Sequence, residues 1–279
     1  GRIDLDQGRA IEELEEVVFD KKLPTDSDCT SFLHTEYRSK LGGLNWFQSR
    51  TQFSINYEFS RLASAAAHPK ILDLLALNKC IRTLKARPVK LRFHPLKGPL
   101  RLVSIPDASF QGNADKSSQM GLAVFLCEAR TSSNAAKGTL IDFQSHKIKR
   151  VTLSTTVSEL YALMKGFGTG LYLKGLWADV SGTSVPLEMR TDANNLVTTA
   201  RTTHAPEQKE TTHMIDVLRR ETAQGAIEEF GHIVTELCLA DSLTKLSAKP
   251  DQLIKTVNSG ILEGLDVHPP FRSGHHYRA

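Results

Sequence analysis

The sequence has no long apolar run, few aromatic residues and few cysteines. Among its 279 residues, no stretch approaches the roughly 18 to 20 consecutive apolar residues that a membrane-spanning helix needs, and the first residues lack the basic-then-apolar layout of a signal peptide. Aromatic residues make up 7% and hydrophobic residues 40%, which excludes collagen, a disulfide-stapled miniprotein and wholesale disorder. We therefore expect an intracellular globular protein with no membrane partner, organised as one large or two small domains.

The four cysteines exclude one kind of metal site. Cys29, Cys80, Cys127 and Cys238 lie far apart along the chain, so no CxxC-type pair exists. Three of them fall inside apolar runs. We expect buried, reduced thiols, which are typical of an intracellular protein.

The first 28 residues are acidic, and the rest of the chain carries a surplus of basic residues. The net charge is +4, but residues 1–28 contain nine acidic and four basic side chains, which leaves 31 basic and 22 acidic ones in the rest. A cationic body is compatible with a nucleic-acid partner, although many proteins with such a surplus bind none. The basic run at residues 146–150 offers Lys147, Lys149 and Arg150 for phosphate contacts, and the alternative is a solvated loop.

The spacing of apolar residues divides the chain into segments. Residues 1–34 are acidic, with one short helix expected around residues 11–19. Residues 35–98 contain three helices at a helical apolar period, separated near Thr51 and at His68-Pro69, and then a linker rich in proline and basic residues. This segment is predicted to be a helical connection to the next domain.

After residue 98 the pattern changes to short runs with strand character. Strands are expected at residues 101–110, 121–128 and 138–145, then a long helix with apolar positions over 157–171, a strand at 185–191, a helical region at 193–224, a strand at 226–235 and a last helical region at 239–258. The order βββαβαβα predicts an α/β domain with a five-stranded mixed sheet over residues 99–260. Residues 261–279 are expected to be a flexible tail.

Four acidic side chains fall at the ends of these elements. Asp107 lies near the end of the first strand, Glu159 in the first turns of the long helix, Asp192 directly after the fourth strand and Asp241 at the start of the last helix. Mixed α/β sheets place ligands at the carboxyl ends of strands. Structural interpretations stay open, since Asp192 and Asp241 are placed as helix N-caps and residues 156–159 fit a capping box.

Four short runs surround these carboxylates. They read Pro-Asp-Ala-Ser-Phe at 106–110, Leu-Ser-Thr-Thr-Val-Ser-Glu-Leu-Tyr-Ala-Leu at 153–163, Thr-Asp-Ala-Asn-Asn at 191–195 and Leu-Ala-Asp-Ser-Leu-Thr-Lys at 239–245. Together they resemble the acidic quartet of ribonuclease H, in the form found in Copia-type long-terminal-repeat retrotransposon Pol polyproteins. That family has Asp-Ala-Asp-Trp, Leu-Ser-Ser-Thr-Glu-Ala-Glu-Tyr-x-Ala-Leu, Asp-Asn-Gln-Ser and Leu-Ala-Asp-x-Leu-Thr-Lys at these places. Residues 37–46 resemble the run that follows the polymerase thumb in the same polyprotein.

The resemblance implies a ribonuclease H-like fold and a metal-dependent endonuclease that cleaves the RNA strand of RNA/DNA hybrids. It assigns Asp107 as the ligand that bridges two Mg²⁺ ions, for which Mn²⁺ can substitute, with Glu159 and Asp192 on the flanks and Asp241 at the second ion. Hard cations prefer such oxygen ligands, and repulsion among the carboxylates should raise their pKa values until metal binds. The hybrid would be recognised by shape, phosphates and 2′-hydroxyls.

Two further expectations come from the same resemblance. No Asp-Asp pair occurs in the chain, so the Tyr-x-Asp-Asp polymerase signature is absent, and the polymerase portion of the same polyprotein is an expected partner. His232 lies nine residues before Asp241, where some ribonucleases H carry a product-release histidine; the alternative is a structural histidine within a strand.

Three alternatives to the nuclease stay open. Pro106 in a central strand, Phe110 in place of tryptophan and the altered pair at 157–158 fit a catalytically decayed copy, which would be a hybrid-binding or scaffold module. Asp192 and Glu228 have the spacing of an integrase or transposase core, but that reading leaves Glu159 and Asp241 without a role. The third alternative is a helical tether at residues 37–86.

Overall fold

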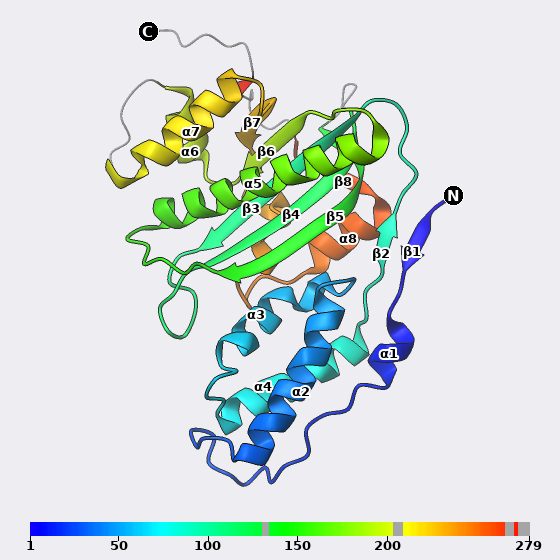
Figure 1. The fold of residues 1–279 in the computed structure, drawn as a ribbon, viewed down its shortest axis with the longest axis vertical. Helices are drawn as coiled ribbons and strands as arrows, with labels where there is room; N and C mark the ends of the chain where they lie inside the picture. The colour runs from blue at the N-terminus through cyan, green and yellow to red at the C-terminus, as the bar shows by residue number, and fades with distance from the viewer. Residues whose placement is uncertain (130–133, 203–208, 266–270, 273–279) are drawn as a thin grey trace. The chain divides into compact units, whose positions relative to one another are not determined.

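The computed structural model describes residues 1–129, 134–202, 209–265 and 271–272 (Figure 1). The chain divides into two compact units: unit 1 comprises residues 1–3 and 92–279, and unit 2 comprises residues 4–91. The boundary falls inside the stretch predicted as a linker, while the division into four segments stays a prediction. No helix within the described residues is both long enough and apolar enough to cross a bilayer.

Unit 2 is built from helices whose apolar sides meet in one core. The three helices expected from the sequence are present as α2 (Ser31–Gln48), α3 (Asn56–Ser64) and α4 (Ile71–Ala86), with a 3-10 turn, η1 (Phe53–Ile55), before α3. Helix α2 begins after Thr30, whose hydroxyl accepts a hydrogen bond from the Leu33 N–H. The buried Tyr37 donates its hydroxyl hydrogen to the Leu62 carbonyl oxygen at 2.8 Å, which joins α2 to α3.

The first helix is shorter than the sequence predicts. Apolar spacing predicts a helix over residues 11–19, but α1 (Gly8–Glu12) ends at Glu12. Beyond it, the Asn78 side chain of α4 accepts a hydrogen bond from the Val17 N–H and donates one to the Val17 carbonyl oxygen, both at 2.8 Å. Because these backbone groups bond to Asn78, they do not form helical hydrogen bonds, and the prediction is wrong for this stretch.

Unit 1 is an α/β fold around one mixed sheet. Strands β3 (Leu100–Ser109), β4 (Gln119–Glu128) and β5 (Ala135–Lys147) form the predicted antiparallel meander. Strand β6 (Leu187–Thr191) pairs in parallel with β3, and β7 (Glu229–His232) pairs in parallel with β6. The order across the sheet is β8-β5-β4-β3-β6-β7-β9. The predicted fold class and its five central strands are confirmed. The edge strands of the sheet are β8 (Ile261–Glu263) and β9 (Phe271–Arg272), and β1 (Ile3–Leu5) pairs separately with β2 (Leu91–Phe93).

The sheet has an additional short strand at each edge, β8 and β9. Both lie in the stretch 261–279, for which the sequence predicts a flexible tail. Gly260 follows helix α8 (Asp251–Ser259) and ends it in a left-handed conformation, with φ of +69°. This residue turns the chain so that β8 pairs with β5. Leu262 is buried there. The tail prediction is therefore wrong for β8 and β9, while residues 266–270 and 273–279 lie outside the described residues.

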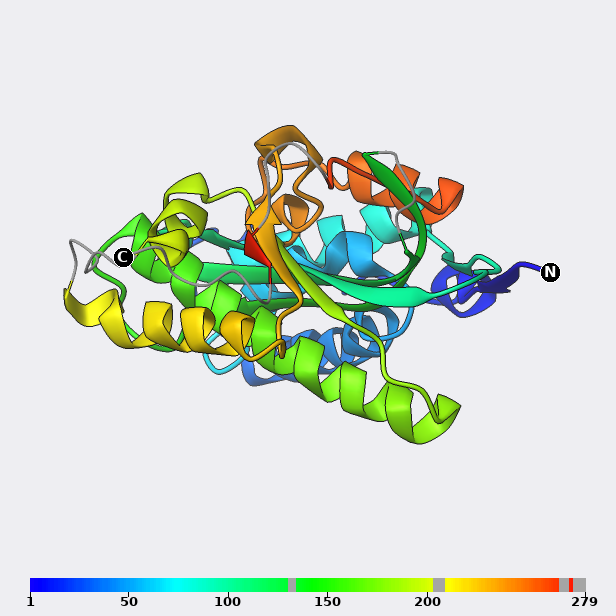
Figure 2. The same cartoon turned by 90° about the horizontal axis from the view of Figure 1, so that it is seen from above.

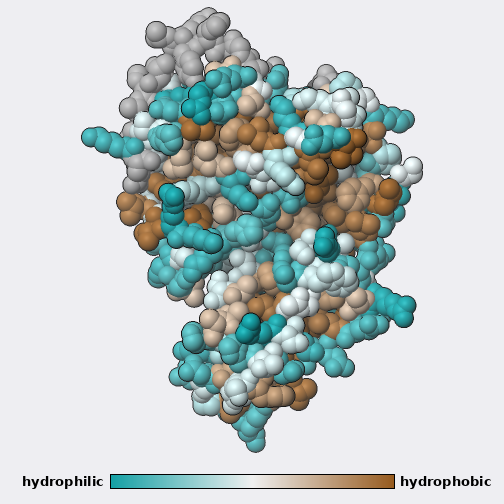
Figure 3. Space-filling view, viewed as in Figure 1, coloured by the Kyte–Doolittle hydropathy of each residue, from teal (hydrophilic) through white to brown (hydrophobic). Residues whose placement is uncertain are grey.

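Helices cover both faces of the sheet (Figure 2). Helix α5 (Thr155–Ser181) and α7 (Thr212–Ala223) lie on one side, α8 (Asp251–Ser259) lies on the other, and α6 (Asn194–Arg201) follows β6. The core of unit 1 is apolar and includes Leu102, Leu163, Phe167, Leu187, Met189, Leu218 and Phe230. Figure 3 shows apolar patches among polar surface on the side that α5 covers.

The helical region predicted at residues 239–258 is interrupted. Asp241–Leu243 form a single 3-10 turn, η4, and α8 begins only at Asp251. Pro250 has no N–H to donate and disfavours a helical backbone at the residue before it, so a helix can begin after Pro250 but cannot run through it. Asp241 therefore opens a short turn and not the last helix, which corrects the prediction.

Helix α5 packs closely on β3 because one of its buried residues is glycine. A Cβ atom on Gly166 would lie 3.0 Å from the Ser104 Oγ and 3.1 Å from the Pro106 Cγ. The Ser104 hydroxyl also donates a hydrogen bond to the Gly166 carbonyl oxygen at 3.2 Å. The contact holds the amino-terminal half of α5, which contains Glu159, against the strand that contains Asp107.

We expect a leucine at this position to destabilise the protein. Gly166→Leu forces bulk against β3 and should lower the free energy of unfolding by about 2 kcal/mol. The matched control is Gly168→Leu on the same helix, which is exposed and has no atom within 4 Å of a Cβ, so its stability should be unchanged or slightly higher. Urea denaturation measures both, and equal stabilities would contradict this account of the packing.

Candidate functional site

Two of the predicted carboxylates lie where the parallel ladder between β3 and β6 ends. The ladder runs from the pair Leu102 and Leu187 to the pair Ser104 and Met189. Asp107 and Asp192 each follow three residues after that last pair, at the carboxyl ends of their strands. This is the position at which mixed α/β sheets bind ligands.

Pro106 is compatible with the hydrogen-bond ladders of the central strand β3. Its Cα still pairs with Leu122 on β4, but the ladder to β6 has ended two residues earlier at Ser104. The missing N–H of Pro106 therefore removes no hydrogen bond from the parallel ladder between β3 and β6. The sequence-based objection to a proline in this central strand does not apply at this place.

The capping interpretation of the acidic residues is wrong. The N-cap of α5 is Ser154, whose hydroxyl accepts a hydrogen bond from the Val157 N–H, so Glu159 lies beyond the capping positions. The N-cap of α6 is Ala193 and that of η4 is Ala240. Neither Asp192 nor Asp241 occupies a cap, and these carboxylates need another explanation.

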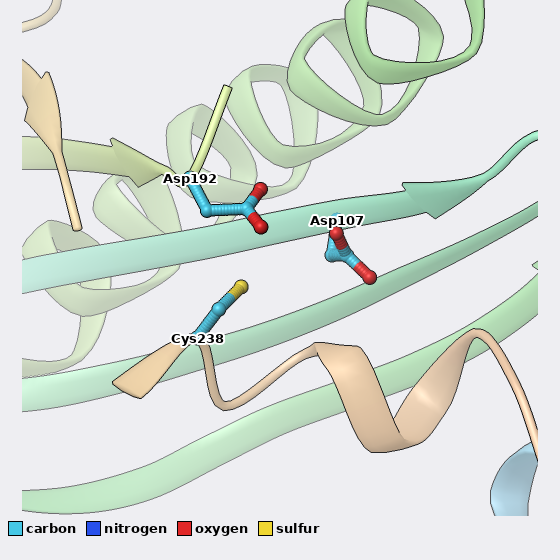
Figure 4. A group of neighbouring side chains, drawn as sticks. All are labelled: Asp107, Asp192 and Cys238. Carbon is cyan, nitrogen blue, oxygen red and sulfur yellow. The ribbon is translucent and has the colours of Figure 1, made fainter. Parts of the chain in front are cut away.

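Asp107 and Asp192 approach each other and a cysteine thiol. One carboxylate oxygen of each aspartate and the Cys238 Sγ all lie within 4.8 Å of one another. Figure 4 shows the Asp192 carboxylate directed toward Asp107, with the Cys238 thiol directed toward the same space from the other side. Asp107 is 3% exposed and Cys238 is 5% exposed, so the group is largely shielded from water.

Glu159 and Asp241 lie near this group but do not belong to it. Among the described residues, the group with ligand atoms inside 4.8 Å contains neither of them. The charges of Asp107 and Asp192 nevertheless act on Glu159, and the charge of Asp241 acts on Asp107 and Asp192. The structure thus gathers all four predicted carboxylates around one place, with two of them in direct reach of a shared ion.

One oxygen of Glu159 is buried without a hydrogen-bond partner. The carboxylate accepts a hydrogen bond from the Ala108 N–H, but Oε2 has no partner in the described part of the chain. An unpaired buried carboxylate oxygen is costly, and a bound cation would satisfy it.

Burial and mutual repulsion shift the titration of these groups. Burial and then the charge of Asp192 raise the pKa of Asp107 to about 7, although the Thr244 hydroxyl opposes the shift. Burial and then the charges of Asp107 and Asp192 raise the pKa of Glu159 to about 9. Burial also raises the pKa of Asp192, which accepts a hydrogen bond from the Thr235 side chain, and the pKa of the Cys238 thiol.

Thr244 and Lys245, which follow Asp241 in the chain, stabilise the cluster of acidic side chains. The Thr244 hydroxyl donates to the Asp107 Oδ2 at 2.7 Å. The Lys245 ammonium forms an ion pair with Asp241. Burial alone would lower the pKa of Lys245, but this pair and the charges of Asp107 and Asp192 raise it. Lys245 therefore supplies positive charge to the acidic cluster.

A glycine makes room for this turn. Gly121 pairs with Asp107 across β3 and β4, and a Cβ on Gly121 would lie 2.8 Å from the Ala240 carbonyl oxygen and 2.9 Å from the Thr244 Cγ2. The absence of a side chain lets η4 sit directly on the strand beside Asp107.

Sequence reasoning missed four residues of this site: Gly121, Cys238, Thr244 and Lys245. Thr244 and Lys245 belong to the quoted run at 239–245, and Cys238 directly precedes it. The spacing of three residues between Cys238 and Asp241 was the only available signal, since the apolar surroundings of Cys238 indicate an inert thiol. The prediction of buried free thiols is confirmed for Cys80, Cys127 and Cys238, whereas Cys29 is half-buried.

The predicted phosphate-binding residues lie at the end of β5 and in the connection that leads to α5. Lys147 is the last residue of β5 and forms an ion pair with Asp115, so the alternative of a solvated loop does not apply at that position. Lys149 and Arg150 are exposed, and the Arg150 guanidinium lies 5.9 Å from the centroid of the Tyr161 ring. Their role in binding stays a prediction.

His232 lies on the opposite face of the sheet from Asp107, and Glu228 lies at the opposite end of β6 from Asp192. His232 pairs with Thr191, so by strand alternation it shares the face of Phe230, opposite to that of Asp107. Glu228 precedes β7 and donates its N–H to the carbonyl oxygen of Leu187, at the start of β6, whereas Asp192 follows the end of β6. The integrase pairing would need both at one end of the sheet.

No protein-family model and no curated protein matches the chain. Solved structures of low similarity do match the chain, and three of them follow. LC11-RNase H1, isolated from compost by a metagenomic approach and solved with an RNA/DNA hybrid, is 16% identical; the match covers 55% of this chain and 99% of that chain at a TM-score of 0.39. The N-terminal RNase H domain of a Mycobacterium tuberculosis protein, fused to maltose binding protein, is 15% identical over 57% of this chain and 98% of that chain, at a TM-score of 0.37.

The third is a foamy viral protease-reverse transcriptase solved with dsDNA, which is 11% identical over 55% of this chain and 96% of that chain, at a TM-score of 0.34. The α/β fold class stands on the strand order of unit 1.

We expect removal of one buried carboxylate to stabilise the protein in the absence of divalent ions. Asp107 binds its proton more tightly in the folded state than in the unfolded state, whose pKa is about 4, so its ionisation lowers stability as the pH rises toward 7. Asp107→Asn removes this penalty and should raise the free energy of unfolding by up to about 4 kcal/mol at pH 8, because the pKa differs by about three units and each unit corresponds to about 1.4 kcal/mol.

Thermal denaturation in a chelator at pH 4, 6 and 8 measures this difference. The gain should be small at pH 4 and grow as the pH rises. Asp179→Asn, which changes an exposed carboxylate of α5, is the control and should leave stability nearly unchanged at every pH. A lower stability of Asp107→Asn at pH 8 would contradict the repulsion inferred for the cluster.

Proposed function

We propose that the chain is a metal-dependent endonuclease of the ribonuclease H type, which cleaves the RNA strand of RNA/DNA hybrids. The observation that supports this most strongly is the convergence of Asp107 and Asp192 at the ends of β3 and β6, with Glu159 and Asp241 within electrostatic reach. These are the four carboxylates that the resemblance to ribonuclease H singles out.

The donor set fits divalent cations. Three aspartates and one glutamate offer hard oxygen ligands, which Mg²⁺ prefers, and the unpartnered Oε2 of Glu159 is a ligand atom without another role. Asp107, Glu159, Asp192 and Asp241 would hold two Mg²⁺ ions, or Mn²⁺ in their place. When bound, such ions activate a water molecule and stabilise the departing oxygen of a phosphodiester.

The residues of the chain itself orient this site. Thr244 fixes the Asp107 carboxylate, the Ala108 N–H fixes that of Glu159, and Thr235 fixes that of Asp192. The raised pKa values of Asp107 and Glu159 mean that protons leave these groups as cations bind. Metal binding should therefore tighten with rising pH.

The exposed cations near the amino end of α5 support a nucleic-acid substrate. Lys149 and Arg150 are open to solvent, and Lys147 lies beside them. Their charges suit the phosphates of a duplex, and an RNA/DNA hybrid offers 2′-hydroxyls and a shape that are read without base contacts. We assign no product-release role to His232, because its strand face is turned away from Asp107.

We further propose an origin in a Copia-type retrotransposon Pol polyprotein. In the run at 239–245, Asp241, Thr244 and Lys245 all interact within the acidic cluster, so the most specific part of the resemblance coincides with the site. Unit 2 would then be the helical connection to the polymerase portion of that polyprotein. The polymerase portion would be the partner of this chain inside the cell.

One observation favours a second candidate function. Asp241 is paired with Lys245, and neither Asp241 nor Glu159 is in direct reach of the ion-binding group. A catalytically decayed copy that binds hybrids, or serves as a scaffold, would retain this arrangement without cleavage.

A labelled RNA/DNA hybrid separates the two functions. The parent chain, Asp192→Asn and the control Glu228→Gln are compared in Mg²⁺, Mn²⁺ and chelator, with a gel-shift measurement of hybrid binding. The nuclease requires cleavage by the parent and by Glu228→Gln, none in chelator, and a loss of roughly 100-fold or more in Asp192→Asn because a metal ligand is removed.

Three results would contradict the proposed nuclease site. Hybrid binding by the parent without cleavage in either metal would favour the decayed module. Equal cleavage rates in the parent and Asp192→Asn would remove Asp192 from the chemistry. A loss of activity in Glu228→Gln would revive the integrase pairing.

A further inference from the structure

The thiol of Cys238 lies beside the carboxylates of Asp107 and Asp192 in the acidic site. The Cys238 Sγ and one oxygen each of Asp107 and Asp192 lie within 4.8 Å of one another, and the thiol is directed into the space between the carboxylates (Figure 4). Sulfur is a poor ligand for Mg²⁺ and a strong ligand for thiophilic ions such as Zn²⁺ and Cd²⁺.

We propose that Asp107, Asp192 and Cys238 form a binding site for a thiophilic divalent cation of the Zn²⁺ class. We call this group the thiolate site. Two carboxylate oxygens and one thiolate are three of the four ligands of a tetrahedral zinc site, and the fourth position stays open for water or for the nearby Glu159. Glu159, which is 7% exposed, has an Oε2 without a hydrogen-bond partner among the described residues, so this oxygen is available as a further ligand.

The geometry requires only a small contraction. Zinc binds sulfur at about 2.3 Å and carboxylate oxygen at about 2.0–2.2 Å, so ligand atoms around one ion lie roughly 3.5 Å apart. The three atoms here are already within 4.8 Å. Rotation of the Asp192 side chain, which is only half-buried, can close part of this difference.

The other buried thiols do not share these surroundings. Cys127 lies against Gly138, where a Cβ would be 2.5 Å from its Sγ, and it belongs to no such ligand group among the described residues. Cys80 has one carboxylate neighbour, Glu58. The charges of Asp73 and Asp28 act on the half-buried Cys29, but among the described residues Cys238 is the thiol whose sulfur lies within 4.8 Å of ligand oxygens from two carboxylates that are also within 4.8 Å of each other.

Occupation of the thiolate site would compete with the proposed nuclease. A thiophilic ion bound by Asp107 and Asp192 takes two ligands that Mg²⁺ would need, so it should inhibit cleavage. The binding step forms a metal–sulfur bond and releases the thiol proton to solvent, and it involves no oxidation or reduction. The inhibition rests on the proposed function, whereas the binding itself does not.

The test uses Cd²⁺ alone, added to the full chain without substrate or Mg²⁺. Cadmium bound to a thiolate gives an ultraviolet charge-transfer absorption, which reports the bond directly. The parent and the control Cys127→Ser should both develop this absorption and saturate at one Cys238-dependent equivalent. Cys238→Ser should lose that equivalent. Asp192→Asn, which keeps the thiol, should bind Cd²⁺ about 10-fold or more weakly because one ligand is lost.

Absence of the absorption in the parent, or its full persistence in Cys238→Ser, would overturn the thiolate site. Equal Cd²⁺ affinity in the parent and Asp192→Asn would do the same, and this comparison holds even if Cys238→Ser fails to fold. A chain that cleaves hybrids but shows no Cys238-dependent absorption would refute the thiolate site alone. A chain that shows the absorption but never cleaves would support the site and refute the nuclease alone.

Discussion

Repulsion between buried carboxylates is the constraint around which the site of unit 1 is built. Asp107 and Glu159 are shielded from water and lie within reach of Asp192, so each charge disfavours the next. Short-range contacts offset part of this cost: the Thr244 hydroxyl and the Ala108 N–H each bond a carboxylate. Lys245 adds a positive charge through its pair with Asp241. These contacts hold the groups together and leave the Glu159 Oε2 without a hydrogen-bond partner among the described residues, which is compatible with the proposed cation site.

The fold creates this arrangement from segments that are distant in sequence. The ladder between β3 and β6 ends three residues before Asp107 and Asp192, which puts both carboxylates at one level beyond the paired strands. Gly166 lets α5 approach β3, and Gly121 lets η4 sit beside Asp107. The same arrangement brings the Cys238 Sγ within 4.8 Å of an oxygen of each carboxylate, so one set of backbone contacts underlies both the proposed nuclease and the thiolate site.

Local patterns predicted the elements that are long and periodic. The three helices of unit 2, the meander and α5 follow from apolar spacing, and the run at 239–245 marked Asp241. The sequence misled where tertiary contacts decide: Asn78 bonds to the backbone of Val17 and α1 ends early, and β8 is too short for a periodic pattern. The capping motif at 156–159 also gave a wrong prediction, because the N-cap of α5 is Ser154, two residues before that motif begins. Cys238 reads as a core residue, and only the packing of η4 reveals its neighbours.

The most direct test of the account is the position of a bound cation. In crystals grown with Mn²⁺, an anomalous difference map should show an ion at coordination distance, about 2.0–2.3 Å, from carboxylate oxygens of both Asp107 and Asp192, with Glu159 Oε2 turned toward it. Carboxylates that remain unligated while Mn²⁺ occupies another place, or no place, would contradict the claim that this cluster is a metal centre.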